Sequence, residues 1–249
     1  MGFIAALQFL TLLPIRRNFT GKQVGGATVY FPLVGVLIGL VLVGLNYVLR
    51  LVLPPALTAA LLMVALAFMS GGLHLDGLAD TMDGLAGHRT AEQRLEIMRD
   101  SRIGGFGAIG LALFLILEYA SIISLPDRWL PYALLLAPVL SRWSMVGSIF
   151  FYPYARPSGL GKAFKEAVKW QHFVIATLVT VLLTVVILKA AGLAALAGVC
   201  LIVLLMASHF TYHLKGLTGD TYGAINEVTT VGVFIVVSLL AKNGWLLPS

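Results

Sequence analysis

Long apolar stretches separated by short polar segments dominate the chain and predict an all-α protein with about seven membrane-spanning helices. The final stretch is short for a bilayer with a hydrocarbon core of about 30 Å, so six or eight spans are alternatives. The expected spans cover residues 27–49, 56–73, 106–125, 130–151, 172–188, 192–214 and 228–241.

Two features at the start of the chain refine this pattern. Residues 1–13 are apolar but too short to cross a bilayer, and they end at Pro14, which predicts an interfacial or re-entrant helix. They lack the basic segment and the small-residue cleavage site of a signal peptide. In the first span, Gly35, Gly39 and Gly44 form a stripe at which another helix is expected to approach closely.

The composition supports a single integral membrane catalytic domain over residues 1–249. Of the 249 residues, 59% are hydrophobic and 11% are charged, and no polar run is long enough to form a soluble domain. The net charge of +6 comes from basic residues dispersed among short loops, which indicates membrane topology rather than a nucleic-acid partner. The single Cys200 excludes a disulfide framework and a thiolate metal site.

The charged residues are distributed unequally between the two faces of the membrane. Alternation of the spans places residues 14–26, 74–105, 152–171 and 215–227 on one face, with Arg16 among them. That face holds twelve of the seventeen Lys and Arg residues and nine of the eleven acids. The positive-inside rule therefore predicts that this face, with its candidate chemistry, is cytoplasmic.

A cluster of acidic residues follows the second span and carries the strongest chemical signal. Asp76, Asp80 and Asp83 have i, i+4 and i+7 spacing, so a helix would place all three carboxylates on one face. Like charges at this spacing repel one another unless a cation binds between them. Mg²⁺, with Mn²⁺ as the alternative ion, prefers such oxygen ligands. A solvated cap on the second span is the simpler alternative.

A basic and glycine-rich segment follows the acids. Arg99 and Arg102 flank Asp100, and Gly104 and Gly105 open the next span. The guanidinium groups of arginines and the free amides of a helix N-terminus both bind phosphate oxygens. Metal-binding carboxylates beside a phosphate cradle are typical of phosphoryl transfer. Ordinary surface ion pairs are the alternative for the arginines, and the glycine turn alone is a weak signal.

Other polar residues extend the candidate site. Arg142 lies in the fourth span and is expected to face the bundle interior, paired with an anionic ligand or with an acid such as Glu118. Asp220 and Glu227 add two acids to the cytoplasmic face, although Asp220 is also a plausible helix cap. His74, two residues before the acids, is a candidate for contacting substrate.

Several motifs together resemble the cobalamin synthase (adenosylcobinamide-GDP ribazoletransferase) family, in order along nearly the whole chain. They are FPLVG at 31–35, GGLHLDGLADTMDG at 71–84, LEIMRDSRIG at 95–104, SR at 141–142 and TGDTYGA at 218–224. The resemblance implies a multi-pass, Mg²⁺-dependent enzyme of the inner (plasma) membrane. Such an enzyme would join adenosylcobinamide-GDP to α-ribazole or its 5′-phosphate and release GMP. The resemblance is also compatible with a homo-oligomer.

The resemblance also implies roles for individual residues. Asp76, Asp80 and Asp83 would hold one or two Mg²⁺ ions on the pyrophosphate. Asp100, Asp220 and Glu227 are alternatives for a further ligand or the general base. Residues expected to contact the substrates are His74, Arg99, Ser101, Arg102, Gly104, Gly105, Arg142, Arg156, Gly161, Thr218 and Asp220.

Two other functions compete with this interpretation. CDP-alcohol phosphotransferases also carry an Asp-rich metal helix, but Asp80 stands where their pattern has an arginine. A cation-coupled transporter would place its acids in the middle of the bilayer and often show two similar halves. Nearly all acids here lie in predicted cytoplasmic loops, which disfavours a transporter.

Overall fold

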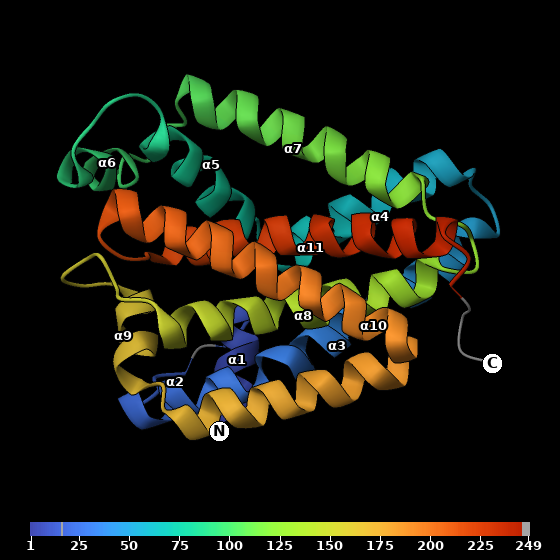
Figure 1. The fold of residues 1–249 in the computed structure, drawn as a ribbon, viewed down its shortest axis with the longest axis horizontal. Coiled ribbons are helices and arrows are strands. Elements are labelled where there is room, and N and C mark those ends of the chain that lie inside the picture. Colours follow the sequence, from blue (N-terminus) through green and yellow to red (C-terminus); the bar gives the residue numbers. More distant parts are fainter. Residues whose placement is uncertain (16, 246–249) are drawn as a thin grey trace.

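The computed structural model describes residues 1–15 and 17–245 and is built almost entirely of helices (Figure 1). Arg16, which the topology prediction places in a cytoplasmic loop, lies outside the described residues. The helices are α1 Gly2–Leu10, α2 Gly21–Ala27, η1 Thr28–Tyr30, α3 Phe31–Arg50, α4 Pro55–Met69, α5 Leu73–Leu85, α6 Ala91–Ile97, α7 Gly105–Ile123, α8 Leu130–Phe151, α9 Leu160–Ala167, α10 Trp170–Leu214 and α11 Gly219–Lys242.

The described helices confirm an all-α polytopic membrane protein. Five helical segments are long and apolar enough to cross a bilayer, and a bent pair, α4 with α5, can form a sixth. The 45-residue α10 reverses direction at Lys189, which has a φ of 48°, so its two arms run in opposite directions (Figure 1). The count of seven spans stays a prediction.

The expected second span, residues 56–73, is not one straight helix. The helix α4 has 15 residues, about 22 Å at 1.5 Å per residue, which is shorter than the hydrocarbon core. The chain then bends by 89° into α5. Gly71 and Gly72 allow this bend because both have positive φ values, 66° and 70°, which favour glycine.

The polar loops also contain more helix than the sequence pattern indicates. The predicted loop at 215–227 is mostly the first turns of α11, because Thr218 caps this helix by accepting a hydrogen bond from the Thr221 amide. Likewise, all of α2 except its last residue, Ala27, lies in the predicted loop 14–26, and α9 lies within 152–171.

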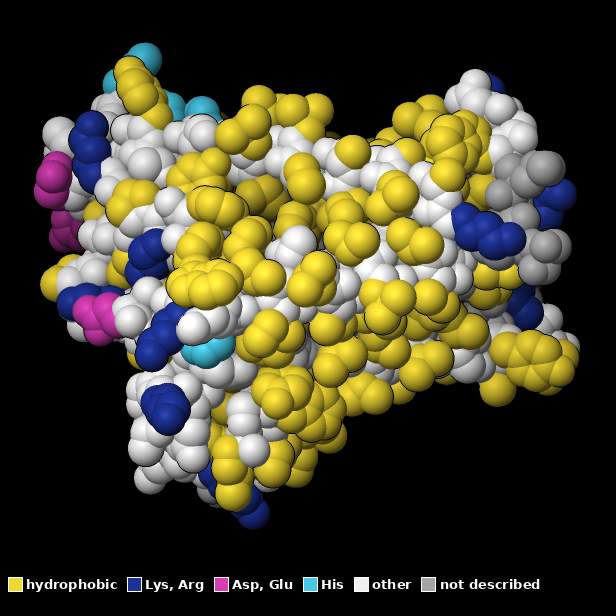
Figure 2. All heavy atoms as spheres, turned by 60° about the horizontal axis from the view of Figure 1, so that its bottom comes forward, with side chains coloured by type: hydrophobic (Ala, Val, Ile, Leu, Met, Phe, Trp, Pro, Cys, Tyr) yellow, Lys and Arg dark blue, Asp and Glu magenta, His cyan; other side chains and the backbone are white. Residues whose placement is uncertain are grey.

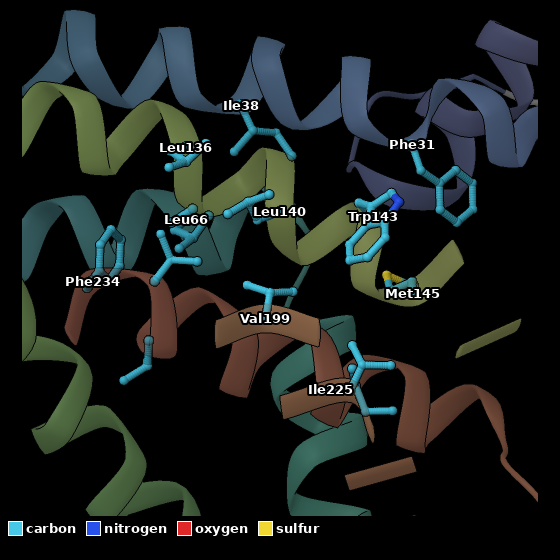
Figure 3. Close-up of a cluster of buried hydrophobic side chains, with 14 of the residues drawn as sticks. Phe31, Ile38, Leu66, Leu136, Leu140, Trp143, Met145, Val199, Ile225 and Phe234 are labelled. Carbon is cyan, nitrogen blue, oxygen red and sulfur yellow. The ribbon is translucent and has the colours of Figure 1, made fainter. Parts of the chain in front are cut away.

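The long helix α8 forms the centre of the bundle and packs against α3, α10 and α11. Side chains of these helices and of α4 meet in the apolar core (Figure 3). A Cβ atom at Gly35 or Gly39 would overlap the backbone of α8 at Pro138 or Leu135. The prediction of close approach is therefore confirmed at these two glycines, whereas Gly44 has no neighbour within 4 Å of such an atom.

The surface separates apolar and charged side chains along the long axis. A broad hydrophobic belt covers the middle of the molecule, and charged side chains gather toward its two ends (Figure 2). The acids of the candidate site follow α4 into the end that also carries α6 and α9 (Figure 1). The predicted cytoplasmic loops thus lie together at one end of the bundle.

Candidate active site

A close crossing of α5 and α11 brings the acids of two distant segments together. A Cβ atom at Gly77 would lie 2.7 Å from the Asp220 carbonyl oxygen, and one at Gly223 would lie 3.1 Å from the Cα atom of His74. Glycine at both positions lets the two backbones approach. Asp80 therefore lies within electrostatic range of both Asp76 and Asp220.

A second connection brings Arg156 to the same place. The loop that follows α8 pairs with the loop before α11, because the Ala155 amide donates to the Leu217 carbonyl and the Leu217 amide donates to the Pro153 carbonyl, both at 2.8 Å. Arg156 Nη2 then lies 2.7 Å from Asp220 Oδ2 and donates to the Met98 carbonyl at 3.2 Å. This arginine ties α11 to the segment after α6.

Two cavities adjoin at Asp76, which lines both. The larger has a volume of about 460 Å³ and is lined by Ala5, Gln8, Phe9, Phe19, Val24, Leu73, His74, Asp76, Met145, Tyr154, Arg156, Ser158, Gly159, Leu160, Gly161, Phe164, Gly219 and Asp220. The smaller has a volume of about 390 Å³ and is lined by Asp76, Ala79, Asp80, Met98, Arg99, Asp100, Ser101 and Ile103.

Asp83 is placed differently from the other two aspartates of its helix. Its Oδ2 accepts a hydrogen bond from the Gly104 amide at 2.7 Å, and its Oδ1 accepts one from the Gly107 amide at 2.8 Å. A Cβ atom at either glycine would overlap the Asp83 carboxylate. Asp83 thus caps the N-terminus of α7 and uses the Gly104 amide that the sequence suggested for phosphate.

Asp76 and Asp80 have the donor chemistry that a Mg²⁺ ion needs. In the described part of the chain, neither carboxylate forms a hydrogen bond or ion pair with another side chain. No group of three His, Cys, Asp or Glu residues forms a ready-made metal cluster among the described residues. Mg²⁺ commonly binds through one or two carboxylates together with water and substrate phosphates, so these two acids supply ligands of the kind that this ion takes.

The segment after α6 borders the smaller cavity with a mixed set of side chains. Arg99, Asp100 and Ser101 line the cavity. Arg102 is instead exposed and forms a fork with Asp100, from Nη2 to Oδ2 at 2.7 Å and from Nε to Oδ1 at 3.0 Å. These hydrogen bonds lower the pKa of Asp100 to about 2. Gly105 begins α7 beside this segment.

A separate polar group lies inside the bundle. Arg142 is 1% exposed, as predicted for a residue facing the interior, and its Nη1 donates to Ser141 Oγ at 3.0 Å. Glu227 is the acid within its electrostatic range, rather than the predicted partner Glu118. Glu227 accepts a hydrogen bond from the Asn226 amide group and does not line either cavity described above.

Of the remaining predicted residues, His74 and Gly161 border the larger cavity, whereas Thr218 precedes the lining residue Gly219. His74 is buried, and its Nε2 has no hydrogen-bond partner among the described residues. Thr218 caps α11 and donates to Asp220 Oδ2 at 3.4 Å. Gly161 packs against the ring of Tyr154, because a Cβ atom there would lie 2.8 Å from Tyr154 Cε2.

Sequence reasoning missed two residues that build this region. Tyr154 lines the larger cavity, and burial raises its pKa; its place in a basic loop, two residues before Arg156, was the available signal. Arg94 is buried and donates to the carbonyls of Arg89, Gly84 and Gly87 at 2.8 to 3.1 Å. It therefore holds the turn after α5 in place, which spacing alone did not indicate.

The fold and the site define an integral membrane protein with acidic and basic side chains around cavities at one end of a helical bundle. The family model described as cobalamin-5-phosphate synthase matches residues 2–238, and the chain belongs to this family. It is therefore a transferase of cobalamin biosynthesis. The match decides against a CDP-alcohol phosphotransferase and against a transporter.

Relatives named adenosylcobinamide-GDP ribazoletransferase are similar over nearly the whole chain. The protein of Roseiflexus sp. is 39% identical, with 95% of this chain and 88% of the relative covered. That of Pseudomonas paraeruginosa is 41% identical, with coverages of 96% and 98%. That of Desulfitobacterium hafniense is 38% identical, with coverages of 90% and 91%. No solved structure matches the chain.

Proposed function

We propose that this protein joins adenosylcobinamide-GDP to α-ribazole or α-ribazole 5′-phosphate with release of GMP, in a Mg²⁺-dependent reaction. The names of the relatives support the two substrates. The observation that carries the chemistry is the position of Asp76, which lines both adjoining cavities. Two substrates bound in these cavities would meet at an acidic junction.

The donor set supports Asp76 and Asp80 as the residues that hold Mg²⁺. When bound, the ion neutralises charge on the pyrophosphate. Asp83, with both oxygens bonded to amides, serves the same site indirectly by fixing α7 against α5. Arg99 borders the smaller cavity and would pair with phosphate oxygens there.

The transfer makes one bond and breaks another at phosphorus. The 3′-oxygen of the ribazole ribose bonds to the phosphorus that carries cobinamide, the bond from this phosphorus to the bridging oxygen breaks, and GMP leaves. The hydroxyl proton passes to a base. Of the three candidates, Asp100 has both carboxylate oxygens held by Arg102, and Glu227 lies inside the bundle. Asp220 borders the larger cavity, and its contacts with Arg156 and Thr218 both use Oδ2. We therefore assign the base to Asp220.

We further propose that the site faces the cytoplasm across an inner (plasma) membrane. Most basic residues belong to the loops at the end of the bundle that carries the site, and the positive-inside rule places such loops in the cytoplasm. Soluble phosphorylated substrates are available in that compartment.

The test is the activity of the purified protein in detergent. The protein is incubated with adenosylcobinamide-GDP, α-ribazole 5′-phosphate and Mg²⁺, and GMP and the corrinoid product are followed by mass spectrometry. We expect equal amounts of both products and their loss when EDTA is added. Full activity in EDTA would refute the metal requirement, and the absence of both products from folded protein with Mg²⁺ would refute the function.

A further inference from the structure

The larger cavity has two chemically different sides, which come from different elements. The side formed by α5, α11 and the loop after α8 supplies the polar residues His74, Asp76, Tyr154, Arg156, Ser158 and Asp220. The side formed by α1, α2, α9 and the segment before α2 is apolar apart from one glutamine, with Ala5, Phe9, Phe19, Val24, Leu160 and Phe164. Figure 1 shows α1, α2 and α9 gathered together, away from α5.

Aromatic rings stiffen the apolar side. The ring centroids of Phe9 and Phe164 are 4.5 Å apart, and Phe31 lies behind both, at 5.9 Å from Phe9 and 5.6 Å from Phe164. Phe31 and Phe164 are almost fully buried, so neighbouring residues hold the rings in place. A rigid aromatic wall of this kind favours a flat, apolar ligand.

The single polar side chain on this side already has its partners. Gln8 donates through Nε2 to the Arg17 carbonyl at 3.2 Å and accepts the Arg17 amide on Oε1 at 3.0 Å. With both polar atoms of Gln8 already engaged, this side offers little to pair with the polar edge of a guanine, which carries several donors and acceptors. A site that leaves such groups unpaired rejects them strongly.

We infer that the apolar side of this cavity, with Phe9 and Phe164, binds the dimethylbenzimidazole base of α-ribazole and selects for it. This inference rests on the proposed function, since it assigns one of the two substrates of that reaction. The base has an apolar methylated edge and a flat bicyclic face, which match the wall. The guanosine part of the other substrate then lies outside this side of the cavity.

The size and position of the cavity agree with this assignment. A volume of about 460 Å³ lies within the usual range of roughly 300–1,000 Å³ for one small ligand, whereas a corrinoid is far larger than a nucleoside. A base held by Phe9 and Phe164 leaves its ribose on the side of Asp76 and Asp220. The attacking hydroxyl then faces the junction with the smaller cavity.

The first test varies the ligand and leaves the protein intact. Calorimetry on the purified protein, without the corrinoid substrate, measures the Kd of α-ribazole, of its analogue without the two methyl groups, and of α-ribosyl guanine. Burial of two methyl groups predicts roughly 15-fold weaker binding of the unmethylated analogue. We expect no measurable binding of the guanine riboside. Equal binding of all three ligands would overturn the inference.

The second test compares two matched substitutions. Phe164→Leu removes part of the aromatic wall, and Phe173→Leu changes a ring that stacks on Phe150 away from the cavity. We expect Phe164→Leu to raise KM for α-ribazole about ten-fold with KM for adenosylcobinamide-GDP unchanged, and Phe173→Leu to change neither. A rise confined to adenosylcobinamide-GDP would contradict the assignment.

Failure of this subsite assignment can be distinguished from failure of the proposed reaction. If the wild-type protein releases GMP but binds the methylated and unmethylated ribosides equally, the inference fails while the proposed function stands. If α-ribazole binds with the expected preference and no GMP forms, the subsite is supported and the proposed reaction fails.

Discussion

The capping role of Asp83 leads to a prediction that separates structure from catalysis. Asp83→Asn replaces a carboxylate that accepts amide hydrogen bonds from Gly104 and Gly107 at the start of α7. The asparagine side chain keeps one oxygen that accepts from one backbone amide, but its NH2 group faces the other backbone amide, which is also a donor. A hydrogen bond to a charged group contributes about 1.5–3 kcal/mol, and a charge at a helix N-terminus contributes about 0.3–1 kcal/mol more.

We therefore expect the free energy of unfolding of the Asp83→Asn protein to fall by about 2–4 kcal/mol. For a chain of this size, that loss corresponds to a decrease in Tm of roughly 4–16 °C. The assay is thermal unfolding in detergent, followed by circular dichroism. Asp127→Asn is the control, because this exposed aspartate forms a surface ion pair with Arg50 and its loss should change stability little.

Activity at low temperature completes the comparison. The folded fraction of Asp83→Asn should retain its requirement for Mg²⁺, with half-saturation near the wild-type concentration, because Asp83 acts through the packing of α7. An unchanged Tm together with a large increase in the Mg²⁺ concentration at half-saturation would refute this reasoning. That result would indicate that Asp83 is a metal ligand, as its spacing from Asp76 and Asp80 predicts.

Three further predictions test the surrounding fold and its orientation. Arg94→Met should lower the free energy of unfolding by about 2–4 kcal/mol in the same unfolding assay, because three carbonyls lose a charged donor; unchanged stability would contradict that role. Gly35→Leu should prevent α3 from packing on α8 and abolish folded protein on size-exclusion chromatography, whereas Gly44→Leu should be tolerated; equal yields would count against this contact. Two variants of a Cys200→Ser protein each carry one introduced cysteine, from Ser101→Cys or from Ser124→Cys. These two cysteines should react with a membrane-impermeant maleimide from opposite sides of the membrane. Labelling of both cysteines from the same side would refute the topology.

Hydropathy and charge predicted most of the architecture because both act locally along the chain. A bilayer demands long apolar helices, and α3, α7, α8 and the two arms of α10 appear where apolar runs indicate them. Hydropathy does not predict the 89° bend between α4 and α5, because the glycine pair at 71–72 lies within a continuous apolar run.

The sequence predicted only those parts of the candidate site whose residues belong to a single helix. The spacing of Asp76 and Asp80 places both acids on one face of α5, and they border the same cavity. The ion pair between Arg156 and Asp220 depends on loops from two distant segments, so no spacing rule could have found it. The same limit applies to Asp83, whose partners belong to the start of another helix.

The Mg²⁺ dependence of GMP release by Asp76→Asn tests the central claim most directly. Asp76 lines both cavities, so the account predicts at least about a 100-fold lower rate than wild type at saturating Mg²⁺, with an unchanged Tm. Asp127→Asn serves as the matched control and should keep the wild-type rate. A near wild-type rate for Asp76→Asn would contradict the account.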